Sequence, residues 1–236
     1  MANCITRQIP NTITCCNLIS GCVATCFAFA ANFRMALLMI VVGAVFDFFD
    51  GMSARLLGVS SPIGKELDSL ADDVTFGVAP ATMVYSLLCI LPYPAFLEPY
   101  RHIVPFVAYI MAAFAALRLA KFNLDERQST SFIGLPTPAN ALFWGSLIVG
   151  AESMMVQQRL ALPVVLVLVA LSCWIMVAEI PMFALKFKQW GWRGNEVRYI
   201  FILSCIPILI LLGISGLAVI IAWYILLSAF TARKQK

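Results

Sequence analysis

The sequence predicts an all-α protein that crosses a membrane several times, and three observations carry that prediction. Of its 236 residues, 62% are hydrophobic and 12% are charged, whereas a soluble domain is about half apolar and about a quarter charged. The mean hydropathy is +0.92. The apolar residues form long runs between short polar segments, and about 20 such residues suffice for a helix to cross a bilayer. Lipid rather than water is therefore expected to surround most of the polytopic helix bundle.

Eight apolar runs are long enough to be spanning helices, with six forming a core and two a C-terminal hairpin. The final apolar stretch, Val197–Phe230, is too long for one comfortable span. Pro207, Gly213 and Gly216 offer places to break it, so we expect a tight hairpin near Leu212–Gly216. Six spans followed by a bent or peripheral pair are the alternative. The expected spans lie near residues 13–32, 35–56, 68–91, 102–122, 136–156, 161–185, 197–212 and 214–231.

Basic residues at the ends of these spans predict the topology, because cytoplasmic loops are enriched in Lys and Arg. With eight spans and both termini cytoplasmic, thirteen basic residues fall on the cytoplasmic side and three on the far side. The net charge of +4 then reflects topology and contact with anionic lipid, and it does not indicate nucleic-acid binding. The cytoplasmic residues are Arg7, Arg55, Lys65, Arg118, Lys121, Arg127, Lys186, Lys188, Arg193, Arg198, Arg233, Lys234 and Lys236, and the far residues are Arg34, Arg101 and Arg159.

The eight cysteines do not form the pattern of a zinc site or a disulfide framework. Most of them lie inside apolar runs, no regular C-x-x-C pair occurs, and the chain has a single His. We therefore expect them to be small apolar residues within membrane helices.

One segment carries more acid than a membrane protein tolerates without a function. Asp47 and Asp50 stand at the end of one apolar run, and Asp68, Asp72 and Asp73 stand at the start of the next. A carboxylate in or near a bilayer is costly and marks a functional site by default. Several together repel one another and favour protonation unless a cation offsets them. The segment therefore predicts a cation site.

The spacing of these carboxylates predicts that they meet at one point. Asp47 and Asp50 share one face of the first helix, and Asp68 and Asp72 are stacked four residues apart on the second. A short loop between the helices would bring all four together as hard oxygen ligands for Mg²⁺ or Mn²⁺, with Ca²⁺ also possible. Four carboxylates suit a two-metal site. Asp73 points about 100° away from Asp72 on a helix, so we place it outside the ligand set.

Small residues and one arginine accompany the acidic stripe. Gly51 and Ala54 lie on the same face as the carboxylates and would leave a slot for a ligand beside the backbone. Gly64, expected between Pro62 and the start of the second helix, would let the chain turn close to that ligand. Arg55 offers a guanidinium fork suited to phosphate oxygens. Taken singly, each has a plain alternative, namely helix packing for Gly and Ala and interfacial anchoring for Arg.

Eight of these residues form a pattern that resembles the signature of the CDP-alcohol phosphotransferases at every position. The pattern is Asp47-x2-Asp50-Gly51-x2-Ala54-Arg55-x8-Gly64-x3-Asp68-x3-Asp72. The resemblance implies a CDP-linked donor, a hydroxyl acceptor, CMP as leaving group and two divalent metals. It implies that the metal ligands are Asp47, Asp50, Asp68 and Asp72, with Asp72 also the general base. It implies nucleotide-diphosphate contacts from Gly51, Ala54, Arg55, Gly64 and Ser61.

Further segments resemble the phosphatidylserine synthase branch of that family, and the resemblance runs from about residue 7 to 141. These segments are Ile9–Leu18, Leu67–Asp72 followed by Phe76–Pro80, Arg118–Asn123 and Phe132–Ala139. The branch implies CDP-diacylglycerol as donor, L-serine as acceptor and a homodimer. It also places Asn11 and Thr14 beside the cytidine. The expected organisation is one transmembrane domain over residues 1–236, with the catalytic core in 1–141 and further helices in 142–236.

A serine acceptor also has a physical requirement, because its carboxylate needs a cation. Arg118, Lys121 and Asn123 stand at the cytoplasmic end of the fourth expected span, at the membrane depth of the acidic cluster. We expect them to bind serine, with interfacial anchoring as the alternative reading. Glu179, before Pro181 in the sixth expected span, is an isolated acid that either pairs with a basic residue or lies near the cytoplasmic end.

These features predict an integral protein of a bacterial-type cytoplasmic (inner) membrane, with its active site at the cytoplasmic face. A sister enzyme that uses glycerol phosphate, inositol phosphate or an archaeal-type lipid donor is the first alternative. A divalent-cation transporter is an alternative of a different class. The transporter is less favoured because the acids lie beside the cytoplasmic charges Arg55 and Lys65 rather than at mid-membrane.

Overall fold

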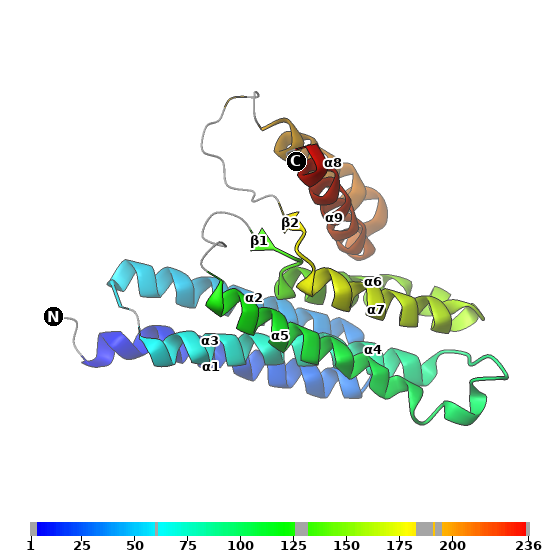
Figure 1. Cartoon of the computed structure of the whole chain (residues 1–236). Coiled ribbons are helices and arrows are strands. Elements are labelled where there is room, and N and C mark those ends of the chain that lie inside the picture. The colour runs from blue at the N-terminus through cyan, green and yellow to red at the C-terminus, as the bar shows by residue number, and fades with distance from the viewer. Residues whose placement is uncertain (1–3, 60, 126–131, 183–190, 192–194, 235–236) are drawn as a thin grey trace.

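The structure is a computed structural model of the chain and describes residues 4–59, 61–125, 132–182, 191 and 195–234. The described part is all-α apart from one pair of two-residue strands, as expected (Figure 1). The helices are α1 (Cys4–Phe29), α2 (Phe33–Leu57), α3 (Pro62–Asp72), α4 (Ala79–Ile90), α5 (Ile110–Leu124), α6 (Thr137–Gln157), α7 (Ala161–Val177), α8 (Glu196–Leu212) and α9 (Gly216–Lys234). The strands are β1 (Phe132–Ile133) and β2 (Pro181–Met182), which pair antiparallel.

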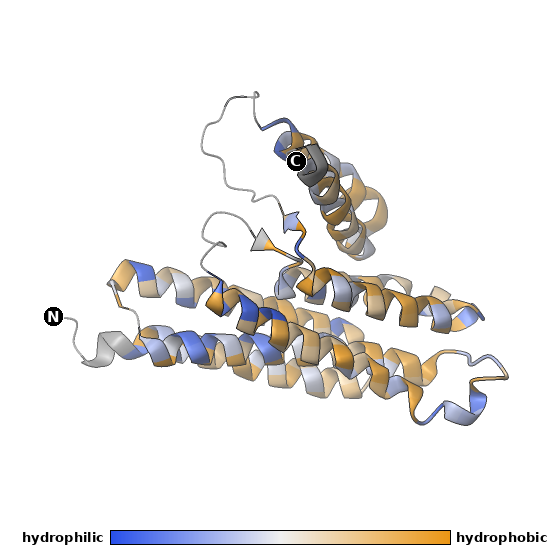
Figure 2. Ribbon diagram, in the orientation of Figure 1, coloured by the Kyte–Doolittle hydropathy of each residue, from blue (hydrophilic) through white to orange (hydrophobic). Residues whose placement is uncertain are grey.

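Six helical stretches within the described residues are long and apolar enough to cross a membrane, which confirms a polytopic membrane protein. Their ends do not reproduce the expected eight spans one for one, because α7 has 17 residues and the last stretch contains both α8 and α9. The hydropathy follows the same plan, with hydrophobic residues along the helices and hydrophilic ones gathered toward their ends and loops (Figure 2). The stretches are Gln8–Phe29, Phe33–Leu57, Pro62–Ile90, Val104–Leu124, Thr137–Gln157 and Glu196–Thr231.

The helices α1 to α7 lie side by side, and successive helices alternate in direction except that α3 continues into α4 (Figure 1). Buried side chains between them form an apolar core. Phe76, Met83 and Leu87 from the third stretch are fully buried, together with Trp144 of α6. The indole N–H of Trp144 donates a hydrogen bond to the Ser172 hydroxyl of α7, so this polar atom is satisfied inside the core. The seven cysteines whose side chains are described are all free, as expected.

A π-helical turn, Asp73–Val78, joins α3 to α4 without ending the helix. A π-turn carries an extra residue and is found mostly at functional sites. Here it presses Thr75 against α1 and α2, where the glycines Gly21 and Gly43 have no room for a Cβ atom. The Thr75 hydroxyl donates to the backbone carbonyl of Asn17 at 3.1 Å. The residues that follow the acidic cluster are therefore locked onto α1.

The sixth expected span, 161–185, is too long at its C-terminal end. Helix α7 stops at Val177, and Ala178 is already extended, with ψ 144°. Pro181 lacks the N–H that would continue a helix, and it pairs within β2 against Ile133. Glu179 is consequently exposed in the segment between α7 and β2 and is not an acid inside a helix.

The C-terminal apolar stretch breaks where the sequence predicts. Gly213 takes a left-handed φ of +57°, which reverses the chain between α8 and α9. The two helices run antiparallel, and a hydrogen bond joins them: the Trp223 indole N–H donates to the Ser204 hydroxyl at 3.1 Å. The hairpin packs on α6 through Gly150, whose missing Cβ makes room for Ser215. Its axis is oblique to the other helices (Figure 1).

Basic residues of the described part of the chain lie at both ends of the bundle. The end of α2 and the start of α3 carry Arg55 and Lys65, and α5 ends beside them with Lys121. At the other end, Arg34 lies in the first turn of α2, and Arg159 lies in the connection between α6 and α7. Five of the basic residues counted for topology, Arg127, Lys186, Lys188, Arg193 and Lys236, lie outside the described residues.

Candidate metal and nucleotide site

The last turns of α2 supply two of the carboxylates. Asp47 is half-buried and Asp50 is 6% exposed, both on the face that turns toward α3. The helix ends at Gly58 in a left-handed conformation, φ 61°, and the N–H of Val59 closes the end by donating to the Ala54 carbonyl. This cap reverses the chain within a few residues, so α3 starts beside the acidic end of α2.

The first turn of α3 supplies a second set of site residues. Ser61 is the N-cap, and its hydroxyl accepts a 2.9 Å hydrogen bond from the N–H of Gly64. Gly64 was expected before the helix, but Pro62 begins the helix and Gly64 therefore lies inside its first turn. A Cβ on Gly64 would lie 3.0 Å from the side-chain oxygen of Asn11, so glycine permits α3 to approach α1 closely.

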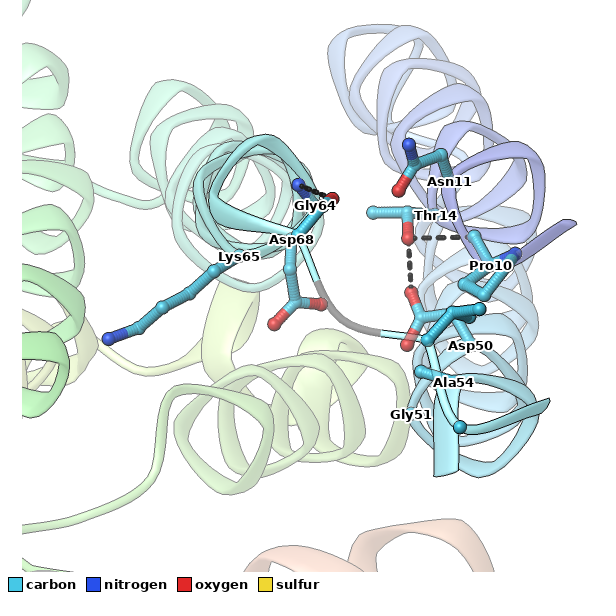
Figure 3. Close-up of a pocket in the computed structure, with 12 residues that line it drawn as sticks. Pro10, Asn11, Thr14, Asp50, Gly51, Ala54, Gly64, Lys65 and Asp68 are labelled. Carbon is cyan, nitrogen blue, oxygen red and sulfur yellow. Dashed lines mark hydrogen bonds between the residues drawn. The ribbon is translucent and has the colours of Figure 1, made fainter. Parts of the chain in front are cut away.

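Three carboxylates meet between α2 and α3. One oxygen from each of Asp47, Asp50 and Asp68 lies within 4.8 Å of the other two. Figure 3 shows the carboxylates of Asp50 and Asp68 on opposite sides of the same space. Oδ1 of Asp68 is buried and has no hydrogen-bond partner within the described part of the chain. Because burial and mutual repulsion disfavour three such anions, the arrangement fits a hard divalent cation.

Asp72, the fourth predicted ligand, lies outside this group of three. It stands one turn beyond Asp68, and its carboxylate interacts electrostatically with those of Asp47 and Asp68. Its Oδ1 accepts a 3.1 Å hydrogen bond from the side-chain amide of Asn17. Asp73 is not part of the group either, and its Oδ1 lies against Gly77.

Helix α1 supplies polar contacts to both acidic helices. The Thr14 hydroxyl donates to Oδ2 of Asp50 at 2.7 Å (Figure 3), and Asn17 reaches Asp72. Thr14 belongs to the predicted site, whereas Asn17 was not among the predicted contacts. The signal was present in the sequence, since Asn11, Thr14 and Asn17 recur every three residues and so place polar groups on one side of an apolar helix. Both Thr14 and Asn17 are buried.

A pocket of about 620 Å³ opens between α1, α2 and α3, beside the carboxylates. Six of the seven predicted nucleotide contacts line it, while exposed Arg55 does not. Among the described residues, no atom lies within 4 Å of the place a Cβ on Gly51 would take, so that residue faces open space. The Lys65 side chain, by contrast, leads away from the carboxylates (Figure 3). The lining residues are Pro10, Asn11, Thr14, Asp50, Gly51, Ala54, Gly58, Val59, Ser61, Gly64, Lys65 and Asp68.

The three residues expected to bind an acceptor divide between two places. Arg118 and Lys121 line a second pocket, of about 390 Å³, between α5 and the end of α7. Arg118 also interacts electrostatically with Asp72. Asn123 instead turns toward α3, where its side-chain amide donates to the Ser69 hydroxyl at 2.7 Å. Its backbone carbonyl accepts from Lys65 at 3.0 Å, so Asn123 ties α5 to α3.

Comparison with known proteins identifies a family model and several curated relatives. A model described as CDP-alcohol phosphatidyltransferase matches residues 7–231. The CDP-diacylglycerol–serine O-phosphatidyltransferase of Bacillus subtilis is 42% identical over 133 residues, which cover 56% of this chain and 70% of the relative. The protein of the same name from Helicobacter pylori (strain J99) is 36% identical over 135 residues, 56% of this chain and 54% of the relative.

An archaeal protein is also similar. The archaetidylserine synthase of Methanothermobacter thermautotrophicus is 29% identical over 136 residues, 57% of this chain and 54% of the relative. This chain therefore matches only about half the length of the Helicobacter and archaeal relatives.

Proposed function

Because the chain belongs to the CDP-alcohol phosphatidyltransferase family, we propose that it transfers the phosphatidyl group of CDP-diacylglycerol to the hydroxyl of L-serine. The products are phosphatidylserine and CMP. One observation carries the proposal. Residues predicted to hold a nucleotide diphosphate line one pocket beside three carboxylates, and two residues predicted to hold an amino-acid carboxylate line a second pocket, where Arg118 interacts electrostatically with Asp72.

We assign the metal ions to Asp47, Asp50 and Asp68, with Asp72 completing a two-metal site for Mg²⁺ or Mn²⁺, or for Ca²⁺. The unpartnered oxygen of Asp68 and the hard carboxylate donor set support this assignment. When bound, the ions would neutralise the diphosphate and stabilise the leaving CMP. Asn17 and Thr14 hold two of these carboxylates in place from α1, so the ligands are oriented before the ions bind.

The donor nucleotide occupies the larger pocket in this proposal. Asn11 and Thr14 lie on its α1 wall, and Gly51, Ala54, Ser61 and Gly64 keep its other walls close to the backbone. Arg55, exposed at the end of α2, approaches the phosphates from outside the pocket.

The acceptor hydroxyl reacts beside Asp72. Its oxygen forms a bond to the phosphorus that carries the diacylglycerol, and the bond from that phosphorus to the CMP oxygen breaks. Asp72 takes the hydroxyl proton, and the electron pair of the broken bond leaves with CMP. Arg118 and Lys121 bind the serine carboxylate, while Asn123 supports this region by joining α5 to α3.

A CMP-release assay tests the reaction. Purified protein receives CDP-diacylglycerol with L-serine, glycerol 3-phosphate or inositol phosphate, each with divalent metal omitted and restored. We expect CMP release that needs both L-serine and the metal. Equal release with glycerol 3-phosphate, and none with serine, would contradict the serine assignment. An archaeal-type CDP-lipid is included as a second donor because one relative is an archaetidylserine synthase.

We further propose eight spans, with both termini and the catalytic site at the cytoplasmic face of a bacterial-type inner membrane. The excess of basic residues at the end of the bundle that carries the site supports this orientation. The reversal at Gly213 supports a C-terminal pair of spans. Reporter fusions at Gly213 and at the C-terminus test it, since only a spanning hairpin places these two points on opposite sides. The family resemblance supports a homodimer, which cross-linking in native membranes would test.

A further inference from the structure

The second pocket carries charges of both signs. Arg118 and Lys121 of α5 line it together with two carboxylates, Asp125 directly after α5 and Glu179 after α7. The remaining lining is apolar and includes Met176 and other aliphatic side chains. Such a pocket suits a small molecule that itself carries both charges.

Arg118 shows where the negative end of that molecule would bind. It is 7% exposed, and its Nε–H has no acceptor within the described part of the chain. A buried guanidinium donor left without a partner is costly. The guanidinium lies 5.3 Å over the Phe122 ring, which holds it in place. The carboxylate of an acceptor bound in the pocket would satisfy this donor.

Glu179 lines the pocket from the segment after α7, and hydrogen bonds of the neighbouring residues hold its backbone in place. It is the central residue of a γ-turn, in which the Ile180 N–H donates to the Ala178 carbonyl at 2.8 Å. The Ile180 carbonyl in turn accepts a 2.9 Å hydrogen bond from Gly134. Gly134 has φ +74° and packs against the Met176 carbonyl, where a side chain has no room.

We propose that Glu179 binds the ammonium group of the acceptor and so makes the second pocket selective for a zwitterionic amino acid that bears a hydroxyl. Arg118 and Lys121 bind the carboxylate end, and Glu179 binds the ammonium end. The inference rests on the proposed transfer reaction and assigns it a specificity-determining residue. An alcohol that lacks the ammonium group cannot form this ion pair with Glu179, and the loss of that contact is the basis of discrimination.

The Glu179→Gln variant tests this role with steady-state kinetics. The KM for L-serine is expected to rise by about tenfold or more, as for loss of a hydrogen bond to a charged group. The KM for CDP-diacylglycerol should stay unchanged. The inhibition constant of 3-hydroxypropionate, which is L-serine without its ammonium group, should also stay unchanged, because that molecule makes no contact with Glu179. Glu179→Asp keeps the charge and should retain part of the serine affinity. If Glu179→Gln folds poorly, the serine KM of Glu179→Asp still tests the role of the charge.

Two variants serve as controls. Glu98→Gln removes a carboxylate from the loop at the opposite end of the bundle, where Glu98 pairs with Arg101, and should leave the KM for L-serine unchanged. Asp125→Asn removes the other carboxylate of the pocket. A serine-specific effect in Asp125→Asn and none in Glu179→Gln would overturn the proposal. An equal rise in the serine KM and the 3-hydroxypropionate inhibition constant would overturn it too, because that result indicates general damage to the pocket.

Failure of the proposed function would look different. Wild-type protein would then release no serine-dependent CMP, whereas failure of the Glu179 assignment requires an active wild type whose serine KM does not respond to the substitution.

Discussion

The side-chain amide of Asn17 on α1 donates a 3.1 Å hydrogen bond to Oδ1 of Asp72 at the end of α3. The two residues are 55 positions apart in the chain. A second hydrogen bond holds Asn17 in place, because its backbone carbonyl accepts from the hydroxyl of Thr75 in the π-helical turn. The amide therefore orients the carboxylate proposed as general base and leaves its second oxygen for the acceptor hydroxyl.

Replacing Asn17 by Ala should lower kcat by about tenfold, the value expected for one buried hydrogen bond to a charged group. The KM for CDP-diacylglycerol should change little, because Asn17 does not line the nucleotide pocket. Steady-state CMP release measures both constants. Thr12→Ala, at an exposed position of the same helix, is the matched control and should behave as wild type. A larger change in KM than in kcat would indicate that Asn17 acts on donor binding instead.

Asp72→Asn should abolish transfer while leaving much of the binding of CDP-diacylglycerol. An amide cannot take the acceptor proton, and loss of a general base costs about 10²- to 10⁴-fold in rate. The readouts are single-turnover CMP release and equilibrium binding of the CDP-lipid. The neighbouring Asp73→Asn is the control, because Oδ1 of Asp73 lies against Gly77, whereas Asp72 interacts electrostatically with Asp47 and Asp68, so Asp73→Asn should keep its turnover. Near-normal turnover in Asp72→Asn would rule out the general-base role.

Asp47→Asn should weaken metal and nucleotide binding together. It removes one of three carboxylates that meet within 4.8 Å. The metal concentration for half-maximal activity should rise, and so should the Kd of CDP-diacylglycerol at fixed metal. Chelation by EDTA should stop wild-type turnover, and added Mg²⁺ or Mn²⁺ should restore it. A variant that loses activity with an unchanged metal requirement would place Asp47 outside the metal site.

Gly51→Ala should affect substrate binding without reducing stability. Its Cβ would meet no protein atom within 4 Å, and Ala is favoured over Gly in a helix by about 1 kcal/mol. The free energy of unfolding should therefore stay the same or rise, while the KM for CDP-diacylglycerol rises because the methyl group enters the nucleotide pocket. Thermal unfolding and CMP release measure the two effects. Ser53→Ala, nearby on α2 but outside the pocket lining, should leave the KM unchanged.

The sequence by itself determined the class of the fold and the position of the carboxylates along it. Long apolar runs require helices in lipid because each backbone polar group must be satisfied within its own segment. The break between α8 and α9 was also predictable, because glycine at position 213 permits the positive φ at which the chain reverses. The spacing of Asp47, Asp50 and Asp68 on two successive helices was enough to predict that they meet.

Only the tertiary structure decided which distant residues complete the site. The Asn17–Asp72 and Thr14–Asp50 hydrogen bonds depend on how α1 packs against α2 and α3, and spacing within one helix cannot specify that packing. The true end of α7 follows from the pairing of β1 with β2, a contact between residues far apart in the chain. That pairing moves Glu179 out of the helix and into the pocket with Arg118. Helical periodicity fixes neighbours along one element, whereas long-range packing fixes the partners across elements.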